Sequence, residues 1–315
     1  MRSFKVIQPG ALTTFQDLGR KGFRQYGIPP SGAMDPIALR TANLLVGNQE
    51  SEIGLEVTLM GLKMIALAPL FVAVTGADLN FTINSEPHPP WRSYLLKPGD
   101  VIHFSNRKNG LRAYLAVQGG FQAPIFFGSG SVFQRGLMGS PLRKDEILEV
   151  RDVRQTSLQD IRIPEKYLPE ISDPVFIRVV MGPQAERFEE EGVDNFLYSK
   201  YRIKPQSDRM AYRLDGPRIL HRGKADIISE PVMPGSIQIP SDGFPIILMM
   251  DAQVTGGYTK IANVIMADMP CLAQLIPGGN IQFKKVDLDE AYQALEERES
   301  ILIWLKRNLS GRSRL

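Results

Sequence analysis

The sequence predicts a mainly β protein built from two similar barrel domains, with few short helices and one helix near the C-terminus. Three observations lead to this prediction. Short segments rich in β-branched and aromatic residues recur along the chain, separated by turn residues. Stretches with a helical period are few. Landmarks from the first half return in the same order in the second half, which favours two copies of one unit.

The repeated landmarks keep a nearly constant spacing. Ser31-Gly-Ala-Met34 returns as Ser207-Asp-Arg-Met210, and Glu56 returns as Glu230. The partners stand 174 to 179 residues apart, which is too long a period for a solenoid. We therefore expect two similar domains, with a functional site that draws equivalent loops from each. The other matched landmarks are Gly61 with Gly235, Pro69 with Pro245, and Pro98-Gly99 with Pro277-Gly278.

The predicted strands are short apolar runs bounded by turn residues. Asn109-Gly110 is a strong hairpin signal, because a type I′ turn needs positive φ at both central positions. It predicts a hairpin between the strands 101–104 and 112–117. The other predicted strands are 55–59, 63–67, 71–75 and 79–83 in the first half, and 175–180, 237–239, 246–250 and 281–286 in the second.

Three helices are predicted. The first begins at Asp35, which can cap it with Pro36 in the first turn, and ends at Gly47. The second covers 184–191 and ends at Gly192. The third covers 287–309, where apolar positions mixed with charge indicate a helix packed along one side.

The domain boundaries follow from the polar segment 151–174, which carries three prolines and is predicted to be a connector. The first β domain is expected to cover residues 1–160, the second 161–290, and the C-terminal helix and tail 291–315.

The composition is that of an ordinary globular protein. Apolar residues make up 43% and charged residues 23%. The net charge of +3 does not indicate a basic surface that would bind nucleic acid. The N-terminus does not read as a signal peptide and no apolar run is long enough to span a bilayer, so we expect a cytoplasmic protein without membrane contact. The single cysteine, Cys271, excludes an internal disulfide and a thiolate zinc cage, and no metal site is predicted.

A first cluster of candidate site residues lies between Gln16 and Asn48. Ser31, Asp35 and the amides at the predicted helix start are suited to an anionic or carbonyl group. The alternative is structural, with Asp35 serving only as a cap and Arg20 pairing with a carboxylate.

Two further clusters lie around Arg209 and Asp251. Asp251 follows the apolar run 246–250, so we expect it where a buried strand emerges into a loop. Thr255-Gly256-Gly257 offers a hydroxyl and unhindered amides for an oxyanion or phosphate oxygen; the alternative is an ordinary glycine turn.

Glu56 and Glu230 stand at equivalent positions of the repeat. Each lies beside apolar strand residues, and carboxylates in such places often pair with arginines. We expect ion pairs with Arg20 and Arg209, and acid–base chemistry is the alternative.

These clusters together resemble a known family. The matching segments are Gln16-Asp-Leu-Gly-Arg20, Ser31-Gly-Ala-Met-Asp35, Ala42-Asn-Leu-Leu-Val-Gly-Asn48, Leu55-Glu56, Ser207-Asp-Arg-Met210, Gly235-Ser-Ile-Gln-Ile-Pro240 and Thr255-Gly-Gly-Tyr258. The family is known as KipA, as the C subunit of 5-oxoprolinase or as allophanate hydrolase subunit 2, and it is biotin-dependent carboxyltransferase-like. The resemblance covers roughly residues 3 to 290.

The resemblance implies a fold and a function. The fold is tandem cyclophilin-like β-barrels, in agreement with the repeat. The function is that of one component of an ATP-dependent 5-oxoprolinase, which hydrolyses 5-oxo-L-proline (pyroglutamate) to L-glutamate and is expected to be inactive without its partners. The implied partners are a B subunit, which is KipI-like, and an A subunit, which is LamB/YcsF-like. The alternatives are a urea carboxylase-like component, with biotin carried by another protein, and a KipI-binding regulator without turnover.

The resemblance also indicates where the sequence departs from the family. Ala252 and Val254 replace the usual arginine and threonine, and Pro231 replaces a glycine. For the predicted site, we expect donors to stabilise charge on an oxygen, an arginine to hold a carboxylate or phosphate in a bidentate fashion, and carboxylates to transfer protons. The expected catalytic residues are Asp35, Glu56, Glu230 and Asp251. The expected substrate-binding residues are Arg20, Ser31, Arg209, Tyr212, Gln253, Thr255, Gly256, Gly257 and Tyr258.

Overall fold

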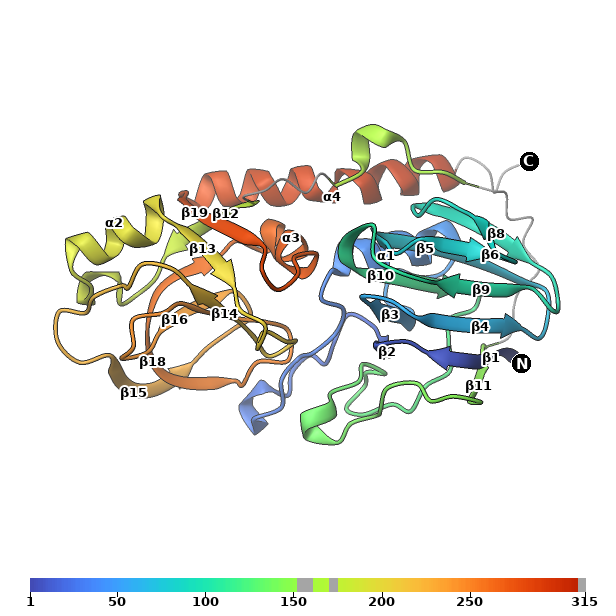
Figure 1. Cartoon of the computed structure of the whole chain (residues 1–315), viewed down its shortest axis with the longest axis horizontal. Coiled ribbons are helices and arrows are strands. Elements are labelled where there is room, and N and C mark those ends of the chain that lie inside the picture. Colours follow the sequence, from blue (N-terminus) through green and yellow to red (C-terminus); the bar gives the residue numbers. More distant parts are fainter. Residues whose placement is uncertain (152–160, 170–174, 311–315) are drawn as a thin grey trace. The chain divides into compact units, whose positions relative to one another are not determined.

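The computed structural model describes residues 1–151, 161–169 and 175–310 (Figure 1). Strands dominate, with four α-helices in the described part of the chain, so the predicted mainly β fold with few helices is confirmed. The chain divides into two compact units. The first comprises Met1–Arg20, Asp35–Pro169 and Glu299–Leu315, and the second comprises Lys21–Met34 and Glu170–Arg298.

The first unit contains two β-sheets around one apolar core. The six-stranded sheet has the order β11-β1-β4-β9-β6-β7, and the five-stranded sheet has the order β2-β3-β10-β5-β8. Strands alternate inward and outward side chains, and Phe4 of β1 and Leu55 of β3 both reach the shared core. The strands are β1 (Arg2–Pro9), β2 (Leu12–Gln16), β3 (Gly54–Thr58), β4 (Leu62–Ala66), β5 (Leu70–Asp78), β6 (Phe81–Ile83), β7 (Glu86–Pro87), β8 (Arg92–Leu96), β9 (Val101–Phe104), β10 (Asn109–Val117) and β11 (Ile147–Glu149).

The second unit is a closed barrel of seven strands. The ring order is β12-β19-β13-β14-β17-β16-β18, and a β12–β18 pairing closes it. β15 pairs with β18 outside the ring and forms an edge (Figure 1). The strands are β12 (Val175–Met181), β13 (Lys200–Ile203), β14 (Ala211–Asp215), β15 (Asp226–Pro231), β16 (Ser236–Ile239), β17 (Ile246–Leu248), β18 (Thr255–Val264) and β19 (Asn280–Lys285).

Two of the helix predictions are confirmed. α1 (Pro36–Leu45) begins after Asp35, whose carboxylate accepts a hydrogen bond from the Ala38 amide at 2.9 Å. This bond satisfies one of the amides that a helix start leaves unpaired. α4 (Leu288–Ser310) matches the predicted helix 287–309 to within one residue at each end. The chain also forms the short α3 (Met269–Ala273).

The predicted helix 184–191 is wrong. A single turn forms at Ala185–Arg187, and α2 (Glu190–Tyr198) begins only where the predicted helix ends. Gly192 lies inside α2 and does not terminate it. A Cβ at this position would come within 2.9 Å of the Leu220 backbone, so the glycine allows close packing.

The predicted hairpin at Asn109-Gly110 is also wrong. β9 pairs with β4 and β6 in the six-stranded sheet, whereas β10 pairs with β3 and β5 in the five-stranded sheet. Gly110 does have a positive φ of 75°. The turn therefore leads the chain from one sheet to the other and does not fold a strand back on its neighbour.

The two units differ from the predicted domain ranges in two respects. Lys21–Met34 belongs to the second unit, where Met34 is fully buried in the barrel core. Glu299–Leu315 belongs to the first unit, where Glu299 and Arg40 form an ion pair. Of the predicted connector 151–174, residues 152–160 and 170–174 lie outside the described residues.

The matched glycines of the repeat share a backbone conformation. Gly61 and Gly235 have φ values of 93° and 92°, and Gly99 and Gly278 have 93° and 90°. These left-handed turns require glycine, so the spacing in the sequence reflects equivalent turns in the two units.

Within the described ranges, no helix combines the length and the apolar character needed to cross a membrane.

Candidate functional site

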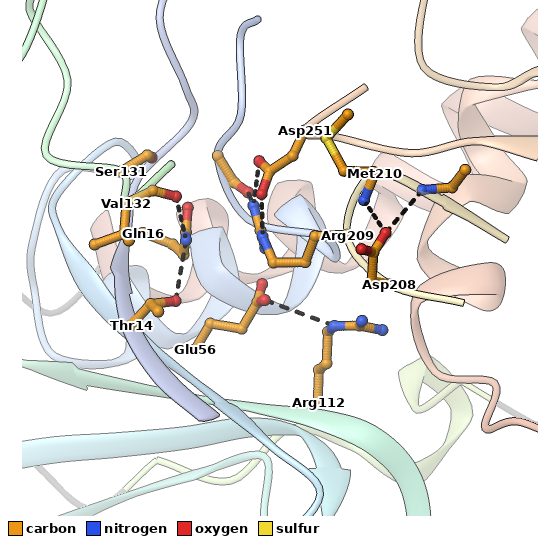
Figure 2. A network of polar contacts seen from close by, with 12 residues as sticks. Thr14, Gln16, Glu56, Arg112, Ser131, Val132, Asp208, Arg209, Met210 and Asp251 are labelled. Atoms are coloured by element: carbon orange, nitrogen blue, oxygen red, sulfur yellow. Dashed lines mark hydrogen bonds and ion pairs between the residues drawn. The ribbon is translucent and has the colours of Figure 1, made fainter. Parts of the chain in front are cut away.

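Arg209 and Asp251 form a buried ion pair in the second unit. Arg209 precedes β14 and Asp251 follows β17, and these two strands are antiparallel neighbours. The pairing therefore brings both residues to the same end of the barrel. Arg209 Nε lies 2.9 Å from Asp251 Oδ2 and Nη2 lies 3.0 Å from Oδ1, a bidentate arrangement (Figure 2). Each side chain is 9% exposed.

The same pair holds the segment that carries Ser31. Arg209 Nη2 donates to the carbonyl oxygen of Gly32 at 2.6 Å, and the Ser31 amide donates to the carbonyl oxygen of Met250 at 3.1 Å. The loop that begins after β17 and the segment before α1 therefore lie against each other. The sequence singled out both segments, and the structure brings them together within one unit.

Ser31 combines two features that are unfavourable for a structural residue. Its φ of 52° lies in the left-handed region, which costs a non-glycine residue about 1–3 kcal/mol. Its hydroxyl is fully buried and has no hydrogen-bond partner among the described residues. An unsatisfied buried polar group costs about 1–3 kcal/mol. Strain and an unused donor at one residue are typical of a ligand-binding position.

Arg209 and Asp251 differ from the roles expected for them. Both Asp251 oxygens accept hydrogen bonds from Arg209, and the Arg209 guanidinium also donates to the carbonyl oxygen of Gly32. The predicted use of Arg209 as a bidentate clamp on a ligand does not fit this geometry. We assign both residues to positioning of the Ser31–Gly32 segment.

The stretch Thr255–Tyr258 is a strand, so the alternative prediction of an ordinary glycine turn is wrong. It forms the start of β18 and pairs with β15, with Glu230 opposite Gly256. A Cβ on Gly256 would lie 2.5 Å from Nε2 of Gln238, so the glycine permits close approach of that side chain. At Gly257 the equivalent point lies 3.3 Å from the carbonyl oxygen of Ile227. Gln253, Thr255 and Tyr258 have exposed side chains.

Glu230 does not pair with an arginine as predicted. Its carboxylate contacts Nζ of Lys260 and accepts a hydrogen bond from Nε2 of Gln184 at 2.8 Å. Lys260 lies on β18 and is 5% exposed, and burial lowers the pKa of its ammonium group.

Glu56 lies in the first unit and also has a different partner from the one predicted. Its Oε2 accepts from the Tyr114 hydroxyl at 2.7 Å. Its Oε1 lies 3.6 Å from Nε of Arg112 (Figure 2). The Tyr114 oxygen in turn accepts from the Asp35 amide at 2.7 Å. Burial and then the Glu56 charge raise the pKa of Tyr114 well above its usual range. Asp35 and Glu56 thus support the start of α1.

The two remaining predicted residues are buried. Arg20 is 1% exposed and its Nη2 donates to the Ser131 carbonyl oxygen in the first unit. Tyr212 is 2% exposed in the barrel core, and its hydroxyl donates to the Leu275 carbonyl oxygen at 3.4 Å.

Sequence reasoning missed Arg112, Tyr114, Gln184, Gln238 and Lys260. The first two stand at alternate positions of β10, and Tyr114 is the register partner of Glu56. Gln238 and Lys260 are likewise register partners. Alternation within a strand was a signal available in the sequence, but the pairing across strands was not.

Comparison with known proteins identifies relatives over nearly the whole chain. Residues 26–285 match the family model described as "Carboxyltransferase domain, subdomain A and B". A protein from Escherichia coli (strain K12), named as the C subunit of 5-oxoprolinase, is 36% identical, over 94% of this chain and 95% of that protein. A protein of the same name from Haemophilus influenzae is 35% identical, over 96% of this chain and 97% of that protein.

The similar structures belong to longer chains. The crystal structure of the K. lactis urea amidolyase superposes with a TM-score of 0.88 at 31% identity, over 95% of this chain and 20% of that one. The structure of TTHA0988 gives a TM-score of 0.83 at 31% identity, over 90% of this chain and 55% of that one.

Proposed function

This chain belongs to the carboxyltransferase domain family, and from that premise we propose that it is one component of an ATP-dependent 5-oxoprolinase, which hydrolyses 5-oxo-L-proline to L-glutamate. The observation that carries the proposal is that the alignments with two relatives cover nearly the full length of both proteins. The two relatives named as the C subunit of 5-oxoprolinase are matched over 95% and 97% of their own length. The urea amidolyase of Lachancea kluyveri is matched over only 18% of its length, at 31% identity.

The chemistry demands stabilisation of a charge that develops on the lactam oxygen. Hydrogen-bond donors aimed at that oxygen are the usual means, and removing one such donor costs about 10²–10³ in kcat. The Ser31 hydroxyl is buried and has no partner in the described part of the chain, which makes it the donor we assign to this role. Arg209 and Asp251 act by holding Ser31 in place.

ATP would supply the free energy for opening a stable lactam. The two arginines predicted to hold a carboxylate or phosphate make contacts within this chain. Arg209 is bidentate on Asp251, and Arg20 is buried with its Nη2 on a backbone carbonyl. We therefore assign ATP binding to the assembly with the partner proteins.

The names of the relatives point to an assembly of several chains. We propose that this chain works with two partners, one KipI-like and one LamB/YcsF-like, in the cytoplasm, and is inactive alone. The second candidate function is the carboxyl-transfer component of a urea carboxylase, which the similarity to the K. lactis urea amidolyase favours.

The experiment is reconstitution. We expect the chain, purified with both partner proteins, to release glutamate from 5-oxoproline only when ATP is present. Transfer of a carboxyl group from carboxybiotin to urea, without glutamate release, would establish the second candidate. Binding of the KipI-like partner with neither reaction would leave a regulatory protein and refute both enzymatic functions.

The role of Ser31 has a matched control. Ser31→Ala should lower kcat by about 10²–10³, because one donor to the oxygen is lost. Thr41 carries another fully buried hydroxyl without a partner in the described ranges, but it lies on α1 in the first unit. Thr41→Val should leave kcat unchanged. Equal effects of the two substitutions would show that the loss is structural and that Ser31 is not a catalytic residue.

A further inference from the structure

The outer face of the barrel carries a polar cluster from which the sequence predicted only Glu230 and Gly256 as site residues. Gln238 on β16 and Lys260 on β18 are register partners, so their side chains lie on the same face. Their neighbours Ile239 and Ile261 point the other way, into the barrel core. Gly256, four residues before Lys260 on β18, shares the outer face and lies opposite Glu230 of β15.

Lys260 and Gln184 converge on one oxygen of Glu230. Lys260 Nζ contacts Oε1 of Glu230, and Gln184 Nε2 donates to the same atom at 2.8 Å. The orientation of the Gln184 amide is determined by its own oxygen, which accepts from the Lys260 backbone amide at 3.1 Å. Two donors, one of them an amide of fixed orientation, thus point at the place where a carboxylate oxygen sits.

Gln238 adds a donor that the protein does not use. Its side chain is 2% exposed, and its Nε2 has no hydrogen-bond partner among residues that the structure describes. It approaches the backbone at Gly256, where a Cβ would lie only 2.5 Å away. Burying an unsatisfied donor costs about 1–3 kcal/mol, so its position beside the Lys260–Glu230 pair calls for a ligand acceptor.

The acceptor in this cluster is held less firmly than the donors. The Glu230 side chain is 37% exposed, against 6% for Lys260. Glu230 lies on β15, the edge strand that pairs with β18, and this pairing has a register irregularity between Asp226 and Glu230. The strand is also largely exposed, with Ile228 at 93%. Buried donors facing an exposed acceptor on an edge strand are what an exchangeable contact requires.

We propose that Lys260, Gln184 and Gln238 form a binding site for a small organic carboxylate, and that Glu230 competes for this site as a built-in carboxylate. A ligand carboxylate would accept from Lys260 and Gln184 through one oxygen and from Gln238 through the other. Glu230 would then turn to solvent. The contact with Lys260 is charge-assisted, so a neutral amide could not replace the carboxylate. The proposal does not depend on the 5-oxoprolinase function.

The test is equilibrium binding of glutarate to the purified full-length chain, measured by calorimetry. Because an internal competitor reduces apparent affinity by the fraction of open sites, Glu230→Gln should bind glutarate at least about tenfold more tightly than the unmodified chain. The neutral diamide of glutarate should not bind to either. In NMR spectra of Glu230→Gln, glutarate should shift the side-chain amide signals of Gln238.

Lys260 is tested in the Glu230→Gln variant, because removing the lysine there does not leave the Glu230 carboxylate without its partner. Adding Lys260→Met to Glu230→Gln should abolish glutarate binding, whereas adding Lys284→Met, at an exposed position of β19, should leave it unchanged. Circular dichroism establishes that each variant is folded. The proposal is overturned if Glu230→Gln binds glutarate no more tightly than the unmodified chain, or if loss of Lys260 leaves that binding intact.

Discussion

Replacing Asp251 by asparagine tests whether the buried ion pair holds the Ser31–Gly32 segment. Asp251→Asn keeps the shape of the side chain but leaves the Arg209 guanidinium, 9% exposed, without its carboxylate. Removing one partner of a buried pair costs about 3–5 kcal/mol. Asparagine retains one acceptor oxygen, so we expect the lower end, about 3 kcal/mol. A loss of this size corresponds to roughly a hundredfold change in an equilibrium constant.

Native-state hydrogen exchange is the appropriate assay. A chain with two compact units need not unfold in one step, so a single global free energy of unfolding would be hard to interpret. The Ser31 amide donates to the Met250 carbonyl oxygen and reports opening of the segment directly. Its protection factor should fall by roughly a hundredfold in Asp251→Asn, because local opening follows the stability of the contact. Amides of β10 in the first unit should keep their protection.

A double-mutant cycle separates the pair from its parts. Arg209→Met alone leaves the Asp251 carboxylate buried without its partner, and the double variant Arg209→Met/Asp251→Asn removes both charges of the pair. We expect the double variant to lose less protection at Ser31 than the sum of the two single losses, by about 0.5–3 kcal/mol. If Asp251→Asn changes Ser31 protection by less than twofold, or lowers protection in β10 equally, the pair does not position this segment.

Two further predictions concern single residues. Burial, and secondly the charge of Lys63, lower the pKa of His103 below 6.5, so the folded chain binds this proton less readily and stability falls as the pH drops below that value. In Lys63→Thr the pKa of His103, followed by NMR titration, should rise yet stay below 6.5, since burial is the larger cause; an unchanged value would refute this assignment. Gly256→Ala should lower the free energy of unfolding of the barrel by about 1 kcal/mol, the low end for overpacking, because its Cβ would meet at 2.5 Å the Nε2 atom of Gln238, the end of a side chain that can move aside. Gly257→Ala, with no atom closer than 3.3 Å, is the control in the same denaturant titration, and equal losses would contradict the packing argument.

Local features of the sequence were enough to predict much of the fold. The cap at Asp35, the C-terminal helix and most apolar strands depend on short-range periodicity and capping, which each segment carries within itself. The repeated glycines were readable for the same reason, because a left-handed turn excludes most other residues.

Predictions that needed a partner strand failed more often. Asn109-Gly110 does form a turn, but the residues around it do not determine whether β9 and β10 pair with each other or enter different sheets. The stretch Thr255–Tyr258 looked like a loop because its glycines are frequent in turns. In the structure one of these glycines makes room for Gln238, a residue of another strand.

The candidate site shows the same division. Ser31, Arg209 and Asp251 could be singled out along the chain as candidate site residues, since serine, arginine and aspartate are seldom buried without a reason. Which charges pair was decided by the barrel: neighbouring strands bring Arg209 to Asp251 and Lys260 to Glu230, although each pair is separated by about thirty residues or more. Ion pairs form between groups that are close in space, and closeness across strands depends on register, a property of the assembled sheet that no single segment contains.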